Sequence, residues 1–289
     1  MVSERVKKEV IKFQKSEITE YFLYKKLAKI TKNKKNKKVL ERLAEEEKIH
    51  YNILKKYSNK EVKPNWFKIC NYYCLSRLFG LTFSVKLMEH NEIKAQVDYK
   101  DLAKAIPAAR RIMKAEEVHE KEIGRLINEQ RLHYTGSIVL GLNDAIVEFT
   151  GSLVGFALAL QQTSIIAGVG LISGVAASLS MGASEYLSIK EEYNGKNPVT
   201  AGIYTGLAYF VTVFFLILPF LLFTNPFVSV GVTLFNAVII IALFNFYVAV
   251  VKEVSFAKKF FNMFVLSFGV AAVSFIIGLL IRTLFNINI

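Results

Sequence analysis

Charged residues are scarce in the second half of this 289-residue sequence, and cysteine is scarce throughout. Residues 136–289 hold only 6 basic and 6 acidic side chains, whereas residues 1–135 hold 31 and 18 and carry the whole net charge of +13. The chain is therefore neither one uniform soluble domain nor a disordered one. With only 2 cysteines it has no disulfide framework. No P-loop, Rossmann fingerprint or Ser-His-Asp pattern is present, so ATP-driven pumping has no support.

Five long apolar stretches occupy the second half, over residues 137–160, 164–188, 199–223, 228–251 and 262–285. A helix needs about 20 apolar residues to cross the hydrocarbon of a bilayer, and only a helix or a closed barrel satisfies its backbone there. The sequence therefore predicts five transmembrane helices in a domain of residues 134–289. This membrane half also argues against nucleic acid as the partner of the basic first half.

The loops between these stretches indicate an orientation. Lysines occur in the second and fourth loops alone, at Lys190, Lys196, Lys252, Lys258 and Lys259. The positive-inside rule then places the first half in the cytoplasm and the C-terminus outside the cell membrane. Because Met1 begins a charged, amphipathic helix, no cleavable signal peptide is expected.

Charged groups within a span cost about 2.5–3.5 kcal/mol to insert, which makes them functional candidates. Asp144 and Glu148 lie four residues apart in the first span, and Met181 and Glu185 lie four apart in the second. Together they could line a path for a divalent cation, with the thioether favouring a softer metal such as Fe(II). The alternative is carboxylates solvated near the helix ends. The second span is also rich in Gly, Ala and Ser, which favours close helix packing.

Four helical stretches are predicted in the first half, at about 3–31, 35–57, 66–104 and 108–131, with short turns between them. Such helices suggest an antiparallel four-helix bundle of residues 1–133, so that the whole protein is all-α. Its apolar stripes carry acidic residues. Glu-x-x-His occurs twice on these stripes, as Glu47 with His50 and as Glu116 with His119.

The other two helices bring further carboxylates to the inward face. The first offers Glu17, with Glu20 as a competitor, and the third offers Glu89 and Glu92, of which either or both could bind. One glutamate from each of two helices and Glu-x-x-His from the other two is the ligand set of di-iron carboxylate bundles. A chance pattern in Glu-rich helices is the alternative, but two copies in phase with apolar stripes favour a di-metal site.

The first 130 residues resemble the rubrerythrin branch of the ferritin-like superfamily. The resemblance rests on Ala115-Glu116-Glu117-Val118-His119-Glu120-Lys121, on Glu89-His90-Asn91-Glu92, and on Glu17 followed by Tyr24. It implies a ferritin-like fold with a di-iron site and favours Glu17 over Glu20. The Cys-rich rubredoxin segment of a true rubrerythrin is missing.

The second half, from about Gly136, resembles the vacuolar iron transporter family. The motif is Val139-Leu140-Gly141-Leu142-Asn143-Asp144 with Met181-Gly182-Ala183-Ser184-Glu185, and Phe246-Tyr247-Val248 resembles a tyrosine segment near the family's metal path. The resemblance implies that Asp144, Met181 and Tyr247 carry translocated Fe(II), and that the protein is a homodimer. Together the two resemblances suggest a membrane-bound ferritin-like iron exporter.

Two functions from different classes follow. The first is a transporter that moves Fe(II), or Mn(II), out of the cytosol in exchange for protons, with the bundle binding and delivering the metal. The second is a membrane-anchored di-iron oxidase or hydroxylase. Five spans with intramembrane Asp, Met and Glu exceed what an anchor needs, which favours the transporter, although a ferroxidase-type activity of the di-iron domain stays open.

Overall fold

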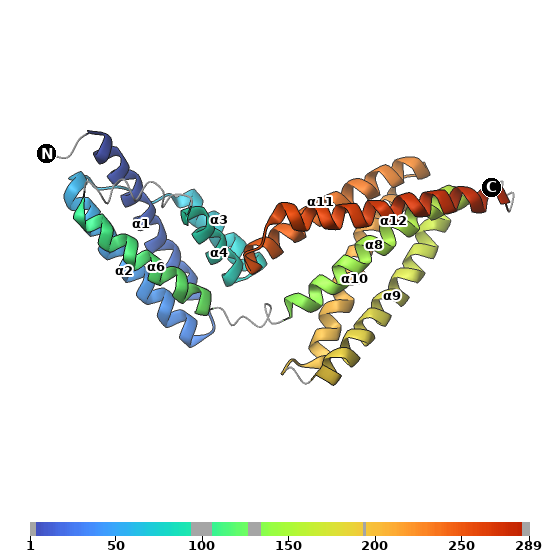
Figure 1. Ribbon diagram of the computed structural model, residues 1–289, viewed down its shortest axis with the longest axis horizontal. Coiled ribbons are helices and arrows are strands. Elements are labelled where there is room, and N and C mark those ends of the chain that lie inside the picture. The colour runs from blue at the N-terminus through green and yellow to red at the C-terminus, as the bar shows by residue number, and fades with distance from the viewer. Residues whose placement is uncertain (1–3, 94–105, 127–133, 193–194, 285–289) are drawn as a thin grey trace. The chain divides into compact units, whose positions relative to one another are not determined.

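The structure is a computed structural model that describes residues 4–93, 106–126, 134–192 and 195–284 (Figure 1). Within these ranges, the side chains of residues 5, 89–93, 117 and 120–126 fall outside the description. The described residues form ten α-helices and no strand, which confirms the predicted all-α class. The chain divides into two compact units, residues 1–129 and residues 130–289.

The first unit contains α1 (Glu4–Ile30), α2 (Lys34–Ser58), α3 (Trp66–Phe79), α4 (Leu81–Ile93) and α6 (Pro107–Leu126). Helix α1 packs along α2 and also contacts α3, while α6 contacts α2 and α4. Asparagines mark the turns. The side chain of Asn33 accepts hydrogen bonds from the backbone N–H groups of Lys35 and Asn36 at the start of α2, and Asn59 ends that helix in the left-handed conformation.

The prediction of one third helix over residues 66–104 is wrong, because the chain turns sharply at Gly80 and α3 and α4 pack against each other. Gly80 has φ 98° and ψ 160°, a conformation essentially restricted to glycine. The Ser84 hydroxyl donates to the Tyr72 carbonyl oxygen at 2.7 Å, although these residues would lie about 18 Å apart along one continuous helix. The predicted part beyond residue 93 lies outside the described residues.

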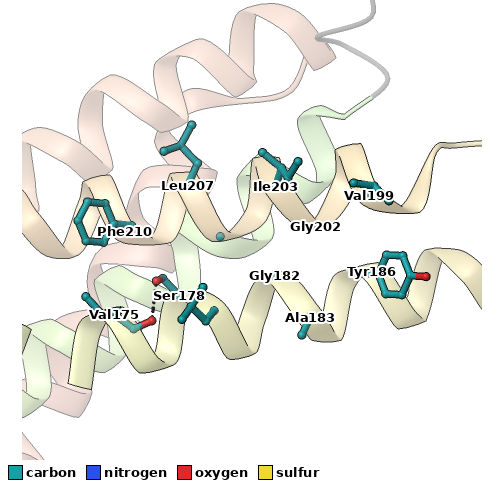
Figure 2. Close-up of a pocket in the computed structure, with 12 residues that line it drawn as sticks. Val175, Ser178, Gly182, Ala183, Tyr186, Val199, Gly202, Ile203, Leu207 and Phe210 are labelled. Carbon is teal, nitrogen blue, oxygen red and sulfur yellow. Dashed lines mark hydrogen bonds between the residues drawn. The ribbon is translucent and has the colours of Figure 1, made fainter. Parts of the chain in front are cut away.

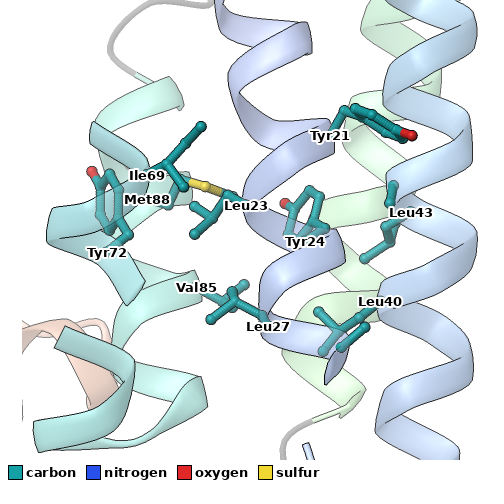
Figure 3. Packing of buried hydrophobic residues seen from close by; sticks show 12 residues of the cluster. Tyr21, Leu23, Tyr24, Leu27, Leu40, Leu43, Ile69, Tyr72, Val85 and Met88 are labelled. Carbon is teal, nitrogen blue, oxygen red and sulfur yellow. The ribbon is translucent and has the colours of Figure 1, made fainter. Parts of the chain in front are cut away.

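Two apolar clusters fill the interior of the first unit. One lies where α1, α2, α3 and α4 meet and is built around Leu27, Leu43 and Met88 (Figure 3). The other joins α1, α2 and α6 through Phe13, Leu54 and Ile112. Along α1, residues 14–20 lie between the two clusters. Polar side chains on this part of α1 therefore have an apolar cluster on either side of them along the helix.

The second unit holds the five helices that are long and apolar enough to cross a membrane, so the protein is a multi-pass membrane protein as predicted. They are α8 (Thr135–Leu160), α9 (Thr163–Glu192), α10 (Pro198–Leu222), α11 (Pro226–Lys252) and α12 (Phe256–Leu284). The predicted ends differ from these by a few residues. The largest difference is at α12, because hydropathy excludes Lys258 and Lys259 while the helical backbone includes them.

Helix α10 packs between α8 and α9, and α12 packs along α8. Small residues permit the close contacts. A Cβ at Gly141 of α8 would lie 2.2 Å from the backbone oxygen of Thr205 on α10, so no larger residue fits there. The apolar centre of this unit includes Phe149, Tyr209 and Leu216, all at most 1% exposed.

Candidate metal centre

Three helices of the first unit direct acidic and imidazole side chains into the space between its two apolar clusters. Glu17 comes from α1, Glu47 and His50 from α2, and Glu116 and His119 from α6. Glu17, Glu47, His50 and His119 are at most 7% exposed. The i,i+3 spacing places both members of each Glu-x-x-His pair on one face of its helix. The sequence predicted these residues, and the structure brings them together.

His50 lies at the centre of three carboxylates. Its Nδ1 is 3.3 Å from Glu17 Oε2, 3.3 Å from Glu47 Oε2 and 3.0 Å from Glu116 Oε1. One ligand atom from each of these four side chains lies within 4.8 Å of the others. This is the size of a site in which one cation could touch all four.

His119 repeats the arrangement on the other side of two of these carboxylates. Its Nδ1 is 3.3 Å from Glu47 Oε1 and 3.6 Å from Glu116 Oε2. Glu47 and Glu116 therefore each turn one oxygen toward His50 and the other toward His119. The two rings are nearly parallel, with centroids 5.7 Å apart. Two carboxylates therefore lie between two imidazoles.

Glu46 also contributes to this centre, although the sequence analysis did not single it out. Its Oε2 contacts His119 Nε2, the ring nitrogen on the far side from the carboxylate pair. A histidine that ligates a metal through one nitrogen commonly donates the other N–H to a carboxylate, which fixes the ring. Nothing in the run Glu45-Glu46-Glu47 distinguishes Glu46, because its partner is on another helix.

The competing carboxylates of the sequence prediction have different positions. Glu20, one turn after Glu17, is buried and accepts a hydrogen bond from Ser16 Oγ at 2.7 Å on its own helix. Glu17 is thus the α1 carboxylate that joins the four-residue group. The side chains of Glu89 and Glu92 on α4 lie outside the described part of the chain.

Burial and mutual contact shift the protonation of this cluster strongly. Burial raises the pKa of Glu17 well above its usual value. Burial also acts to raise the pKa of Glu47, but contacts with His119 and His50 outweigh it and lower that pKa to about 2. Burial lowers the pKa of each imidazole, but the carboxylates around them raise it to about 12 for His50 and about 10 for His119.

When no metal is bound, protons on the two imidazoles therefore balance the negative charges of the carboxylates. Both imidazoles carry a positive charge at neutral pH and stand in for cations between the carboxylates. Glu116 Oε1 and His119 Nδ1 are buried, and within the described residues they have no hydrogen bond of good geometry. Carboxylate oxygens and imidazole nitrogens suit divalent transition metals, so the residues fit a metal ion that would displace these protons.

The predicted intramembrane residues have different surroundings in the second unit. Asp144 and Glu148 are exposed on one face of α8, and the Tyr209 hydroxyl of α10 donates a hydrogen bond to Glu148 Oε2. Glu185 of α9 is buried and accepts a hydrogen bond from Ser137 Oγ at 2.6 Å. Ser137 lies about two helical turns before Asp144 on α8. Tyr209 was not singled out by the sequence, because it lies within a uniformly apolar run.

Two further residues predicted for the membrane path lie on α9 and α11. Met181 of α9 is partly buried against the apolar centre that includes Phe149 and Tyr209. Tyr247 of α11 is half-buried. Among the described residues, the group of His, Cys, Asp or Glu side chains with metal-site geometry is the one in the first unit.

Part of the second unit matches the model of a known protein family. Residues 135–194 match the model of the VIT family. The match covers α8 and α9, so it includes Asp144, Glu148, Met181 and Glu185. It confirms the resemblance to this family for that segment and supports a membrane protein that transports metal ions. No curated protein and no solved structure gives a significant match to the chain.

Proposed function

We propose that the protein moves Fe(II), or Mn(II), across the cell membrane and out of the cytosol, and that its first unit binds the metal and delivers it to the membrane helices. One observation carries this proposal. The buried group of Glu17, Glu47, His50 and Glu116 occurs in the same chain as five membrane-spanning helices whose first pair matches the VIT family.

The first unit would act as a ferritin-like di-metal bundle. Glu17, Glu47, Glu116 and His50 would hold one ion. Glu47, Glu116 and His119 would contribute to a second, with Glu46 orienting the His119 ring. A carboxylate of α4, Glu89 or Glu92, would complete the second site by the sequence pattern. Fe(II) in such a site supplies redox chemistry, which a delivery role does not need.

Asp144, Glu148, Met181, Glu185 and Tyr247 would carry the metal through the membrane. The exposed carboxylates of Asp144 and Glu148 support this assignment, because charged groups in contact with lipid are costly and instead face a water-filled path or another protein surface. A second copy of the chain placed against this face of α8 would enclose both carboxylates. We therefore propose a homodimer.

Proton exchange would drive the export. Carboxylates must be deprotonated to bind a metal, so a carboxylate path can alternate between metal and protons. The loop lysines support an orientation with the first unit in the cytoplasm, on the side where the exported metal would be captured.

Transport into sealed vesicles tests the proposal. Purified protein would be reconstituted in liposomes that hold a metal-sensitive dye and a pH dye, with Mn(II) as a probe that resists oxidation. We expect metal uptake linked to proton movement, abolished by Asp144→Asn and slowed at low metal concentration by Glu47→Gln. Asn143→Ala, one residue from Asp144, serves as a neighbour control.

The alternative function is an outcome of the same experiment. If parent and Asp144→Asn liposomes accumulate metal equally slowly, the membrane helices do not transport it. Oxygen consumption with Fe(II) that survives Asp144→Asn but is lost in Glu47→Gln would then indicate a membrane-anchored di-iron oxidase.

A further inference from the structure

An apolar groove runs along the outer surface of the second unit between α9 and α10 (Figure 2). It has a volume of about 570 Å³, within the roughly 300–1,000 Å³ of small-molecule sites. Its walls are aliphatic and aromatic side chains, among them Val175, Leu179, Ile203 and Phe210. The function proposed above does not use this groove.

Glycine contacts between the two helices create the groove. A Cβ at Gly202 would lie 2.5 Å from the backbone oxygen of Gly182, and one at Gly206 would lie 2.9 Å from that of Ser178. The backbones therefore meet with no side chain between them. The larger side chains of α9 and α10 form the two walls of the groove, and the glycine contact forms its floor. The groove therefore runs parallel to the two helices.

The length of the groove corresponds to one leaflet of a bilayer. Its lining on α9 extends from Val175 to Tyr186, which is about 16 Å of helix at 1.5 Å per residue. The hydrocarbon core of a bilayer is about 30 Å thick. Because α9 spans the membrane, one end of the groove lies near the bilayer centre, at Val175 and Phe210, and the other lies near the interface, at Tyr186 and Val199 (Figure 2).

The interfacial end carries a cation. The Lys190 Nζ atom, one turn beyond Tyr186 on α9, lies 5.8 Å from the centroid of the Tyr186 ring. A tyrosine followed one turn later by a lysine suits the boundary between hydrocarbon and headgroups, and the ammonium group can pair with a phosphate oxygen. Glu191 and Glu192 follow directly and are exposed. Their negative charges do not favour a headgroup that carries a further negative charge besides the phosphate.

We propose that this groove is a binding site for one glycerophospholipid molecule. One acyl chain lies along the glycine floor between α9 and α10, and the phosphate that every glycerophospholipid carries pairs with Lys190. An acyl chain fits because the groove has the length of one leaflet, is apolar along that length, and ends beside a positive charge at the level where a lipid carries its phosphate.

Native mass spectrometry of the full-length protein, purified in detergent and supplied with phosphatidylethanolamine or phosphatidylglycerol, tests the site. We expect the parent to retain one phospholipid per chain with either headgroup. Ala183→Phe places a ring in the groove and should reduce this retention several-fold. Ala272→Phe, on the exposed face of α12, is the matched control and should retain the lipid as the parent does.

The contribution of the headgroup is tested separately by Lys190→Gln, a change on the exposed end of α9 that leaves the groove intact. It should weaken retention of both phospholipids, but not of diacylglycerol, which lacks the phosphate. Lys258→Gln, at an exposed lysine that does not line the groove, should leave the retention of the phospholipids and of diacylglycerol unchanged.

Two results would overturn the proposal. One is equal lipid retention by the parent and Ala183→Phe. The other is a parent that carries no lipid and runs as a dimer which Ala183→Phe converts to a monomer, because the groove would then be covered by a second copy of the chain. The mass spectrum reports lipid and oligomeric state together, and none of these variants replaces a proposed metal ligand.

Discussion

Replacing Glu47 by glutamine should destabilise the first unit of the metal-free protein at neutral pH. Glu47 is 1% exposed and has an imidazole on each side. Its pKa is lowered from 4.5 to about 2, a difference of about 2.5 units that corresponds to about 3 kcal/mol. Glutamine has nearly the same shape but no charge, so Glu47→Gln removes the attraction between this carboxylate and the two imidazolium groups.

The pH dependence gives the sign of this effect. Because the folded-state pKa of Glu47 lies below the unfolded value, its stabilisation is fully present above about pH 4.5 and is lost as the pH falls toward about 2. The raised pKa values of His50 and His119 act in the opposite direction. Their stabilisation is present below the ordinary value of 6.5 and is lost as the pH rises through about 10 and about 12. Both contributions are therefore present at pH 7.

Tryptophan fluorescence measures the first unit alone, because the single tryptophan, Trp66, lies on α3 with its ring 5.3 Å from that of Phe22 on α1. At pH 7 and with chelator present, Glu47→Gln should lower the midpoint of thermal unfolding by about 10 °C relative to the parent. The difference should shrink as the pH is lowered from 4.5 to 2. Glu45→Gln makes the same charge change at an exposed position of α2 and should leave the midpoint within error of the parent.

Metal addition extends the experiment. Mn(II) at 100 times its dissociation constant should stabilise the parent by about 2.7 kcal/mol, and Glu47→Gln should lose most of this gain. A difference between parent and variant that is the same at pH 3 and pH 7, or that Glu45→Gln reproduces, would refute the electrostatic reasoning. Equal stabilisation of parent and Glu47→Gln by Mn(II) would remove Glu47 from the metal site.

Three further predictions concern packing and backbone conformation. Gly80→Ala should destabilise the first unit by about 1–3 kcal/mol, because alanine is strained at φ 98°; denaturant unfolding followed by tryptophan fluorescence would measure it. Leu43→Ala, at a fully buried position, should cost about 2–5 kcal/mol in the same assay, whereas Ile49→Ala, at a position that is 56% exposed, should cost less than 1 kcal/mol; similar losses would refute the assigned core. Gly202→Leu should separate α9 from α10, because a Cβ there would lie 2.5 Å from the Gly182 oxygen. Gly202→Leu should lower the midpoint of thermal unfolding of the second unit in detergent. An unchanged midpoint would contradict the close contact between the two helices.

The sequence alone determined those features that depend on neighbouring residues of one chain segment. The length of an apolar run decides whether a helix can cross a bilayer, so five spans could be counted without a structure. The spacing of Glu47 and His50, and of Glu116 and His119, places each pair on one helix face. The motif around Asp144 was enough to indicate the family that residues 135–194 match.

Only the tertiary structure decided which faces of different helices meet. The contacts of His119 with Glu46, of Tyr209 with Glu148 and of Ser137 with Glu185 join residues far apart in the chain. They depend on how each helix is rotated and how closely its backbone approaches the next, which periodicity along one helix does not contain. The turn at Gly80 escaped prediction for a related reason. An isolated glycine within an apolar helical pattern can continue a helix or end it, and here packing of α4 against α3 favours the end.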